Sequence, residues 1–217
     1  MQLSMRVLCL AFLTCVSQLH AQEPIIIPGG TSPSGEFAIA VYVDKSSGDL
    51  DLIDAPTPNV YLIDAKTKKR IGPLEEVDTS GAGWGSTASN VSAQWSPDSK
   101  YLIITFRAGK YMRCYELYQV KGRRAIPVGL PSAKTHPKGK ILDVLTPSSK
   151  ATGNLRFISN SIIVETTYPW LPAEGHEEEN YSKFGLPDFN GELEFYYRLQ
   201  KNGQWKFYDI RAPKEDR

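Results

Sequence analysis

The chain has 217 residues and carries 25 Lys and Arg against 24 Asp and Glu, a formal net charge of +1. This balance gives no support to nucleic-acid binding or to a role on an anionic membrane surface. The length is sufficient for a substantial hydrophobic core, so the chain can fold without disulfides or metals.

Residues 1–21, MQLSMRVLCLAFLTCVSQLHA, are predicted to be a cleaved secretory signal peptide. Arg6 precedes an apolar run that is too short to span a bilayer, and the segment ends at Ala21. A lipid anchor on Cys15 is not favoured, because the Thr before it is a poor neighbour for attachment. The mature chain would therefore be secreted or periplasmic, without stable membrane insertion. It would have no formal net charge and a single thiol, Cys114, best interpreted as a small buried filler.

One hairpin pattern occurs twice along the chain and again in weaker form. Residues 31–43 read TSPSGEFAIAVYV, and residues 93–106 read AQWSPDSKYLIITF. Proline at the second position of a type I turn, followed by Asp, Ser or Gly, is typical of a tight hairpin. A third copy, NLRFISNSIIVETTY over 154–168, lacks the proline. We expect equivalent turns at Ser32–Gly35, Ser96–Ser99 and Ser159–Asn160, with inner strands that are buried on both faces.

Further strand signal follows each hairpin. The segments are NVYLIDAKTKKRIG (59–72), YMRCYELYQVKGRRAIPV (111–128) and ELEFYYRLQKNGQWKFYDI (192–210). Residues 191–200 alternate between apolar and polar, which predicts a half-exposed outer strand. Four strands with a buried inner strand, repeated at a fixed interval, predict an all-β fold of antiparallel four-stranded blade-like sheets, a partial or atypical β-propeller.

The segments SPSGEFAIAVY, WSPDSKYLIITF and VYLIDAKTKKRIG resemble hairpins of the TolB-like propeller family, related in pattern to WD-repeat blades. The resemblance implies an exported binding platform or an accessory domain of a peptidase. Closed propellers have about four to eight blades, whereas three copies are visible here. We expect one domain over 22–217. It could be closed by a partner chain, form a compact three-unit domain, or hide a fourth irregular unit in 131–153.

Long connections at 78–90, 131–153 and 168–190 are expected to be loops, where binding residues of such folds commonly lie. The first is rich in Gly and Ser around Trp84, but it lacks the Gly-Lys-Ser/Thr ending of a phosphate loop. The second contains several lysines and His136 and is interpreted as a solvated linker.

The connection at 168–190 is acidic and aromatic. Its HEEEN stretch differs from the zinc-protease motif, because Asn180 stands where the second His would be, and the spaced carboxylates of a calcium loop are missing. We interpret it as a solvent-facing acidic loop anchored by its aromatic residues. The candidate binding residues of the chain are Trp84, Trp170, Glu174, His176, Glu177, Glu178 and Tyr181.

Two functional hypotheses remain. One is a non-enzymatic exported module that binds a protein, peptide or glycan of the cell envelope. The alternative is a carbohydrate-active hydrolase that uses Glu174, Glu177 or Glu178 with Asp188. Catalytic motifs are absent from the sequence, so we favour the binding module, without a cofactor, a metal or nucleic acid. A monomer whose ends are capped by the two later connections is favoured over a homodimer. The aromatic residues that need covering are Phe195, Tyr196, Tyr197, Trp205, Phe207 and Tyr208.

Overall fold

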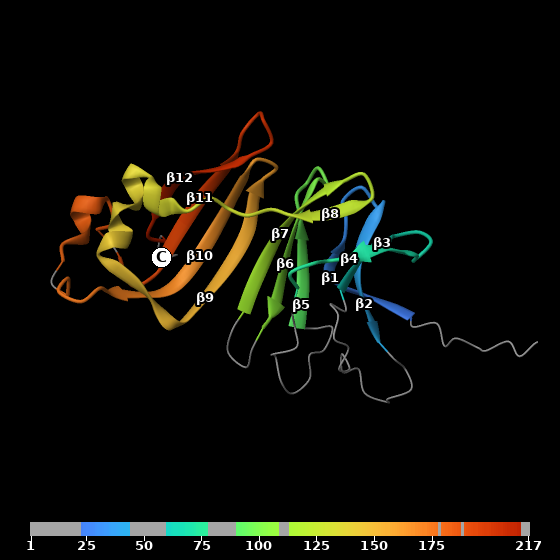
Figure 1. Ribbon diagram of the computed structural model, residues 1–217, viewed down its shortest axis with the longest axis horizontal. Helices are drawn as coiled ribbons and strands as arrows, with labels where there is room; N and C mark the ends of the chain where they lie inside the picture. Colours follow the sequence, from blue (N-terminus) through green and yellow to red (C-terminus); the bar gives the residue numbers. More distant parts are fainter. Residues whose placement is uncertain are drawn as a thin grey trace, which may run out of the picture.

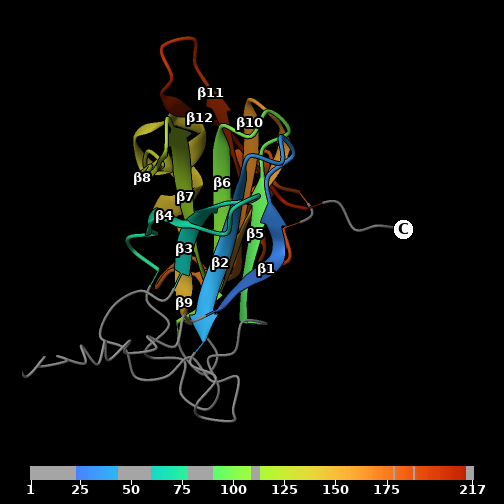
Figure 2. The same cartoon turned by 90° about the vertical axis from the view of Figure 1, so that its right-hand side faces the viewer.

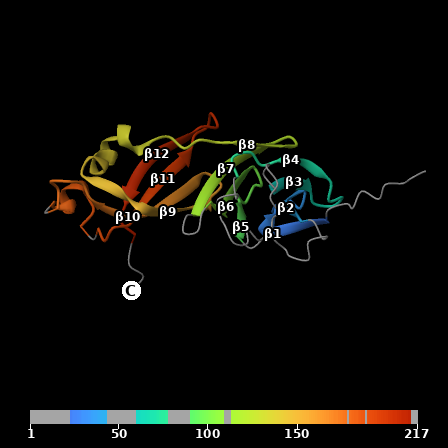
Figure 3. The same ribbon diagram turned by 60° about the horizontal axis from the view of Figure 1, so that its bottom comes forward.

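The computed structural model describes residues 23–43, 60–77, 90–108, 113–177, 179–187 and 189–213. The predicted signal peptide and most of the first long connection, including Trp84, lie outside these ranges. The described chain forms three antiparallel sheets of four strands each, which follow one another along the long axis (Figures 1 and 3). The predicted fold class, all-β with repeated blade-like sheets, is confirmed.

Each sheet is a meander whose strands pair in chain order. The first contains β1 (Glu23–Thr31), β2 (Phe37–Val43), β3 (Val60–Asp64) and β4 (Arg70–Pro73). The second contains β5 (Val91–Trp95), β6 (Tyr101–Arg107), β7 (Arg113–Lys121) and β8 (Arg124–Pro127). The third contains β9 (Leu145–Ser159), β10 (Ile162–Pro172), β11 (Leu193–Leu199) and β12 (Trp205–Arg211). The described residues also form the 3-10 helices η4 (Ala133–Thr135), η5 (Pro137–Asp143) and η6 (Tyr181–Phe184). No helix in the described ranges is long and apolar enough to cross a membrane.

The first two predicted turns contain equivalent hydrogen bonds. The hydroxyl of Ser32 accepts from the Phe37 amide at 3.1 Å, and that of Ser96 accepts from the Tyr101 amide at 2.9 Å. The fourth residue of each turn has a positive φ, 69° at Gly35 and 60° at Ser99. The third turn consists of residues 160 and 161 and lacks this pattern. The predicted equivalence therefore holds for the two Ser-Pro turns and not for the third.

Neighbouring turns are joined in series by hydrogen bonds. The Ser34 amide donates to the Ser99 hydroxyl at 3.0 Å, and the Asp98 amide donates to the Asn160 side-chain oxygen at 3.0 Å. These partners lie 65 and 62 residues apart, close to the spacing of the sequence repeat. Successive units therefore meet at equivalent positions. In Figure 2, which looks along the long axis, the first sheet lies in front of the second.

Two main apolar layers hold the sheets together. Ile39 and Leu62 of the first sheet belong to the same buried cluster as Leu102 and Ile104 of the second. Alternate residues of β6, such as Ile103, instead belong to a cluster with the third sheet. The inner strands β2 and β6 are therefore buried on both faces, as predicted. In β10 the prediction holds for Ile163 and Val164, whereas the later part of the strand is more exposed.

The prediction of a solvated linker at 131–153 is wrong. It forms η4, η5 and the first part of β9, which pairs with the end of β10 in the register Trp170↔Pro147. Ala133, Ile141 and Leu145 are buried in the cluster of the third sheet. Lys134, Lys138 and Lys140 are exposed, whereas Ile141 and Leu145 pack into the core. The segment is neither a solvated linker nor a fourth four-stranded unit, and β10 likewise extends through Pro172 into the third predicted connection.

The prediction for residues 191–200 is also corrected. β11 is paired on both sides, by β10 and by β12, rather than lying at an edge. Tyr196 on its more open face is nevertheless 9% exposed, because Tyr208 and the guanidinium of Arg211 pack on its ring. The remaining aromatic residues of the predicted exposed end are covered by the chain itself, in a cluster with Ile141 and Leu186. They are Phe195, Tyr197, Trp205 and Phe207.

Candidate binding sites between the sheets

The carboxylates predicted to form a binding loop are mostly engaged within the loop. Glu177 accepts from the Gly175 amide at 3.2 Å, and backbone N–H groups lower the pKa of Glu177. Glu179 contacts Lys183 at 2.6 Å and His176 at 3.4 Å, and the hydrogen bond from Lys183 is the main cause of its lowered pKa. Glu174 is exposed. Glu178 and Asp188 lie outside the described residues, so the predicted carboxyl pair cannot be placed.

Trp170 and Tyr181 are packed against the third sheet. The Trp170 ring lies 6.0 Å from that of Phe195, and the Tyr181 ring lies 4.8 Å from that of Phe189. Both side chains border the core cluster that contains Leu186. These two candidates thus anchor the acidic loop. The structure brings His176 to Glu179, and it groups the two aromatic candidates around the core. No group of His, Cys, Asp and Glu that could hold a metal occurs in the described part of the chain.

A carboxylate held by two tyrosines lies at a cavity between the second and third sheets. Glu165 of β10 accepts a hydrogen bond from Tyr115 of β7 and another, at 2.8 Å, from Tyr197 of β11. The cavity has a volume of about 340 Å³ and is bordered by residues 128–132 of the segment that leads from β8 to η4. Burial, followed by the charge of Glu165, raises the pKa of both tyrosines, so both phenols stay protonated and donate.

Glu165 therefore joins the second sheet to the third. Its two carboxylate oxygens each accept one tyrosine hydroxyl, and Tyr115 and Glu165 come from different sheets. Such charge-assisted hydrogen bonds offset the cost of removing a carboxylate from water. Sequence reasoning missed this cluster because the three residues are far apart and form no linear motif. A single Glu inside the apolar stretch IIVETTY was the only signal.

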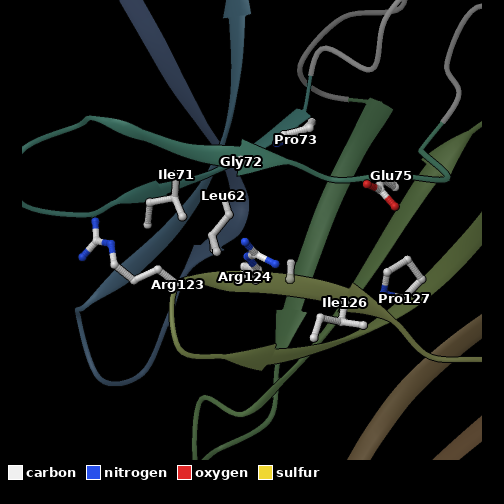
Figure 4. Close-up of a pocket in the computed structure, with 10 residues that line it drawn as sticks. Leu62, Ile71, Gly72, Pro73, Glu75, Arg123, Arg124, Ile126 and Pro127 are labelled. Carbon is white, nitrogen blue, oxygen red and sulfur yellow. The ribbon is translucent and has the colours of Figure 1, made fainter.

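A second cavity, of about 350 Å³, forms a groove between the outer strands β4 and β8. Figure 4 shows Leu62 and Ile71 on the side of the first sheet, and Arg124, Ile126 and Pro127 on the side of the second. Leu62 is 1% exposed, whereas Ile126 is 44% exposed. The groove thus combines a buried apolar floor with an apolar side chain that reaches solvent.

Contacts between the two sheets hold this groove at both ends. At one end the guanidinium of Arg123 contacts the Asp64 carboxylate at 3.3 Å. At the other, the hydroxyl of Tyr118, a fully buried residue of β7, donates to the backbone carbonyl of Glu75. The groove is therefore a built feature of the packing between sheets rather than a gap between loose loops.

The strands that flank the groove are short and end in proline. β4 reads RIGP and β8 reads RAIP, and each is the last strand of its sheet. Short edge strands with proline are poor templates for pairing with another chain, because proline has no N–H to donate. A ligand in the groove would therefore be recognised mainly through side chains. The shared Arg-x-x-Pro pattern was visible in the sequence, but its position beside a groove was not.

No family model and no curated protein matches the chain. Among solved structures, a chain from a structural and mechanistic analysis of two prolyl endopeptidases is similar, with 9% sequence identity and a TM-score of 0.38. The match covers 88% of this chain and 23% of that chain, so the protein spans less than a quarter of that length. A likeness this distant assigns neither activity nor substrate. The resemblance to the TolB-like family therefore rests on the pattern of strands and turns in the sequence.

Proposed function

We propose that the protein is an exported, propeller-like binding module that docks a segment of an envelope protein in the groove between β4 and β8. The observation that carries this proposal is the groove itself. It is fixed at both ends by contacts between sheets, and Ile71 and Ile126 offer apolar surface above the buried Leu62. Preformed concave sites with an apolar lining and a few polar groups are the usual form of ligand sites.

Several observations support binding rather than catalysis. The described carboxylates of the acidic loop, Glu177 and Glu179, are used in local contacts, and Glu165 is held by two tyrosine hydroxyls. Among the described residues that line the groove, Glu75 is the one carboxylate, beside Arg123 and Arg124. This lining offers charge and apolar contact and lacks the paired carboxyl groups that glycoside hydrolysis uses. Export rests on the pattern of residues 1–21.

Site-specific photo-crosslinking in native envelopes tests the proposal. A photo-reactive side chain replaces Ile126 in the groove or, as a matched control, Ile158 of β9, which is 51% exposed. We expect a discrete adduct with one partner from position 126, weak or absent adducts from position 158, and loss of the adduct when Ile71→Asp is added. Equal adducts from both positions, or an adduct that survives Ile71→Asp, would overturn the proposal.

A further inference from the structure

Two neighbouring turns at one end of the groove concentrate positive charge. The β3–β4 turn carries Lys66, Lys68 and Lys69. The β7–β8 hairpin carries Lys121 at the end of β7, Arg123 in the turn and Arg124 at the start of β8. We refer to these six residues as the basic turns, and all six are exposed. The chain as a whole has a formal net charge of only +1, so this concentration is a local property of the fold.

The two turns lie side by side, and an ion pair joins them. Arg123 contacts Asp64, the acidic residue that begins the first turn, at 3.3 Å. The same carboxylate accepts from the backbone amides of Thr67 at 2.9 Å and Lys66 at 3.2 Å. Asp64 is thus already used to shape the turn and to join the sheets. It offsets one of six positive charges, so the basic turns keep a surplus of positive charge.

The basic turns are continuous with the groove. Arg123 and Arg124 line its first part, next to Leu62 and Ile71, and Glu75 lies toward the other end (Figure 4). A ligand that lies along the groove would therefore meet cations first and apolar surface next. Surface ion pairs contribute little energy each, so the charges serve mainly to attract and orient the ligand, while apolar burial supplies affinity.

We propose that the partner segment is an extended acidic peptide whose carboxylates lie on the basic turns and whose apolar side chain enters the groove between Ile71 and Ile126. This inference rests on the proposed binding function and names the chemistry of its ligand. Charge complementarity selects an acidic segment, and the apolar lining beside the arginines selects a peptide over a purely anionic polymer.

Fluorescence polarisation with three labelled peptides tests the inference on the mature protein. The first peptide combines Asp and Glu with two leucines, the second has Asn and Gln in place of the acids, and the third has Ser in place of the leucines. We expect the first to bind about tenfold more tightly than either analogue, and more weakly as salt rises from about 50 to about 300 mM. The triple variant Lys68→Gln, Lys69→Gln, Arg124→Gln should lose this preference for acid. Lys134→Gln with Lys140→Gln, exposed lysines near the third sheet, is the control and should keep it.

The outcomes separate the inference from the function. If the neutral peptide binds as well as the acidic one and Ile126→Asp weakens both, the acidic inference fails and the binding function stands. If no peptide binds while the crosslink at position 126 persists, the inference again fails alone. If that crosslink is lost as well, both the acidic-peptide inference and the proposed binding function fail. A DNA oligonucleotide that binds as tightly as the acidic peptide, with no effect of Ile126→Asp, would replace the peptide with a general polyanion surface.

Discussion

The indole N–H of Trp95 donates a hydrogen bond of 2.9 Å to the backbone carbonyl of Gly30, 65 residues earlier in the chain. Trp95 ends the first strand of the second sheet, and Gly30 lies near the end of the first strand of the first sheet. Trp95 is 7% exposed, so the bond is made away from water. One residue thus links two successive units at the spacing of the sequence repeat.

Replacing Trp95 with Phe should lower the free energy of unfolding by about 1–3 kcal/mol beyond the loss of packing, because the Gly30 carbonyl is left without this buried donor. Urea denaturation followed by fluorescence or circular dichroism measures the change. Trp205→Phe is the matched control. Trp205 is 6% exposed, and its indole N–H has no partner in the described part of the chain. Equal losses in the two variants would show that the Trp95 hydrogen bond contributes little.

Gly29 is required by a close approach between the first two sheets. Its φ is +68°, and a Cβ there would lie 2.1 Å from the backbone oxygen of Ala93. Gly29→Ala should therefore destabilise the fold far more than backbone strain alone does. Gly35→Ala is the control for backbone strain alone, because Gly35 has a φ of +69° with nothing within 4 Å of the added Cβ. We expect about 1–2 kcal/mol for Gly35→Ala and a larger loss, or failure to fold, for Gly29→Ala. Similar melting temperatures would contradict the close contact.

Asp64 should make stability depend on pH at the acidic end. Hydrogen bonds from the Thr67 backbone, assisted by Arg123, lower its pKa from 3.8 to about 2 in the folded state. A carboxyl group whose pKa is lower when folded contributes stability above its unfolded pKa and loses it as the pH falls through the folded value. Asp64→Asn should thus lower the melting temperature at pH 7, and the difference from wild type should shrink between about pH 4 and about pH 2. A constant difference across this range would show that the charge of Asp64 is not responsible.

Glu165 and Tyr197 should be energetically coupled. A double-mutant cycle with Glu165→Gln and Tyr197→Phe isolates their interaction, for which we expect a coupling free energy of about 0.5–3 kcal/mol in urea denaturation. The more exposed pair Arg156 and Glu194, at 3.0 Å on the third sheet, provides the control cycle. Its coupling should lie at about 0–1 kcal/mol. A stronger coupling in the control pair would show that burial does not strengthen the hydrogen bond between Glu165 and Tyr197, which both lie in the third sheet.

The hairpins could be predicted because their causes are local. A Ser-Pro turn followed by a strand such as FAIAVYV contains its own signals, and the strands β3 and β4 around the turn at 65–69 were readable in the same way. The burial of β2 and β6 on both faces followed as well, because strands with no polar face must be covered from both sides. The residues of these turns and strands can be interpreted from their nearest neighbours in sequence.

Three hairpin copies at a spacing of about 64 residues could be recognised in the sequence, whereas the number of four-stranded units stayed open until the three sheets were seen. The contacts between the units depend on the tertiary structure. Glu165 meets Tyr115 because the second and third sheets pack together, and Leu62 lines the groove because β4 and β8, from different sheets, lie beside each other. Ile141 is covered, although its segment reads as a lysine-rich linker, because burial depends on which surface lies opposite a residue. That surface comes from a distant part of the chain, so periodicity and turn chemistry carry no information about it.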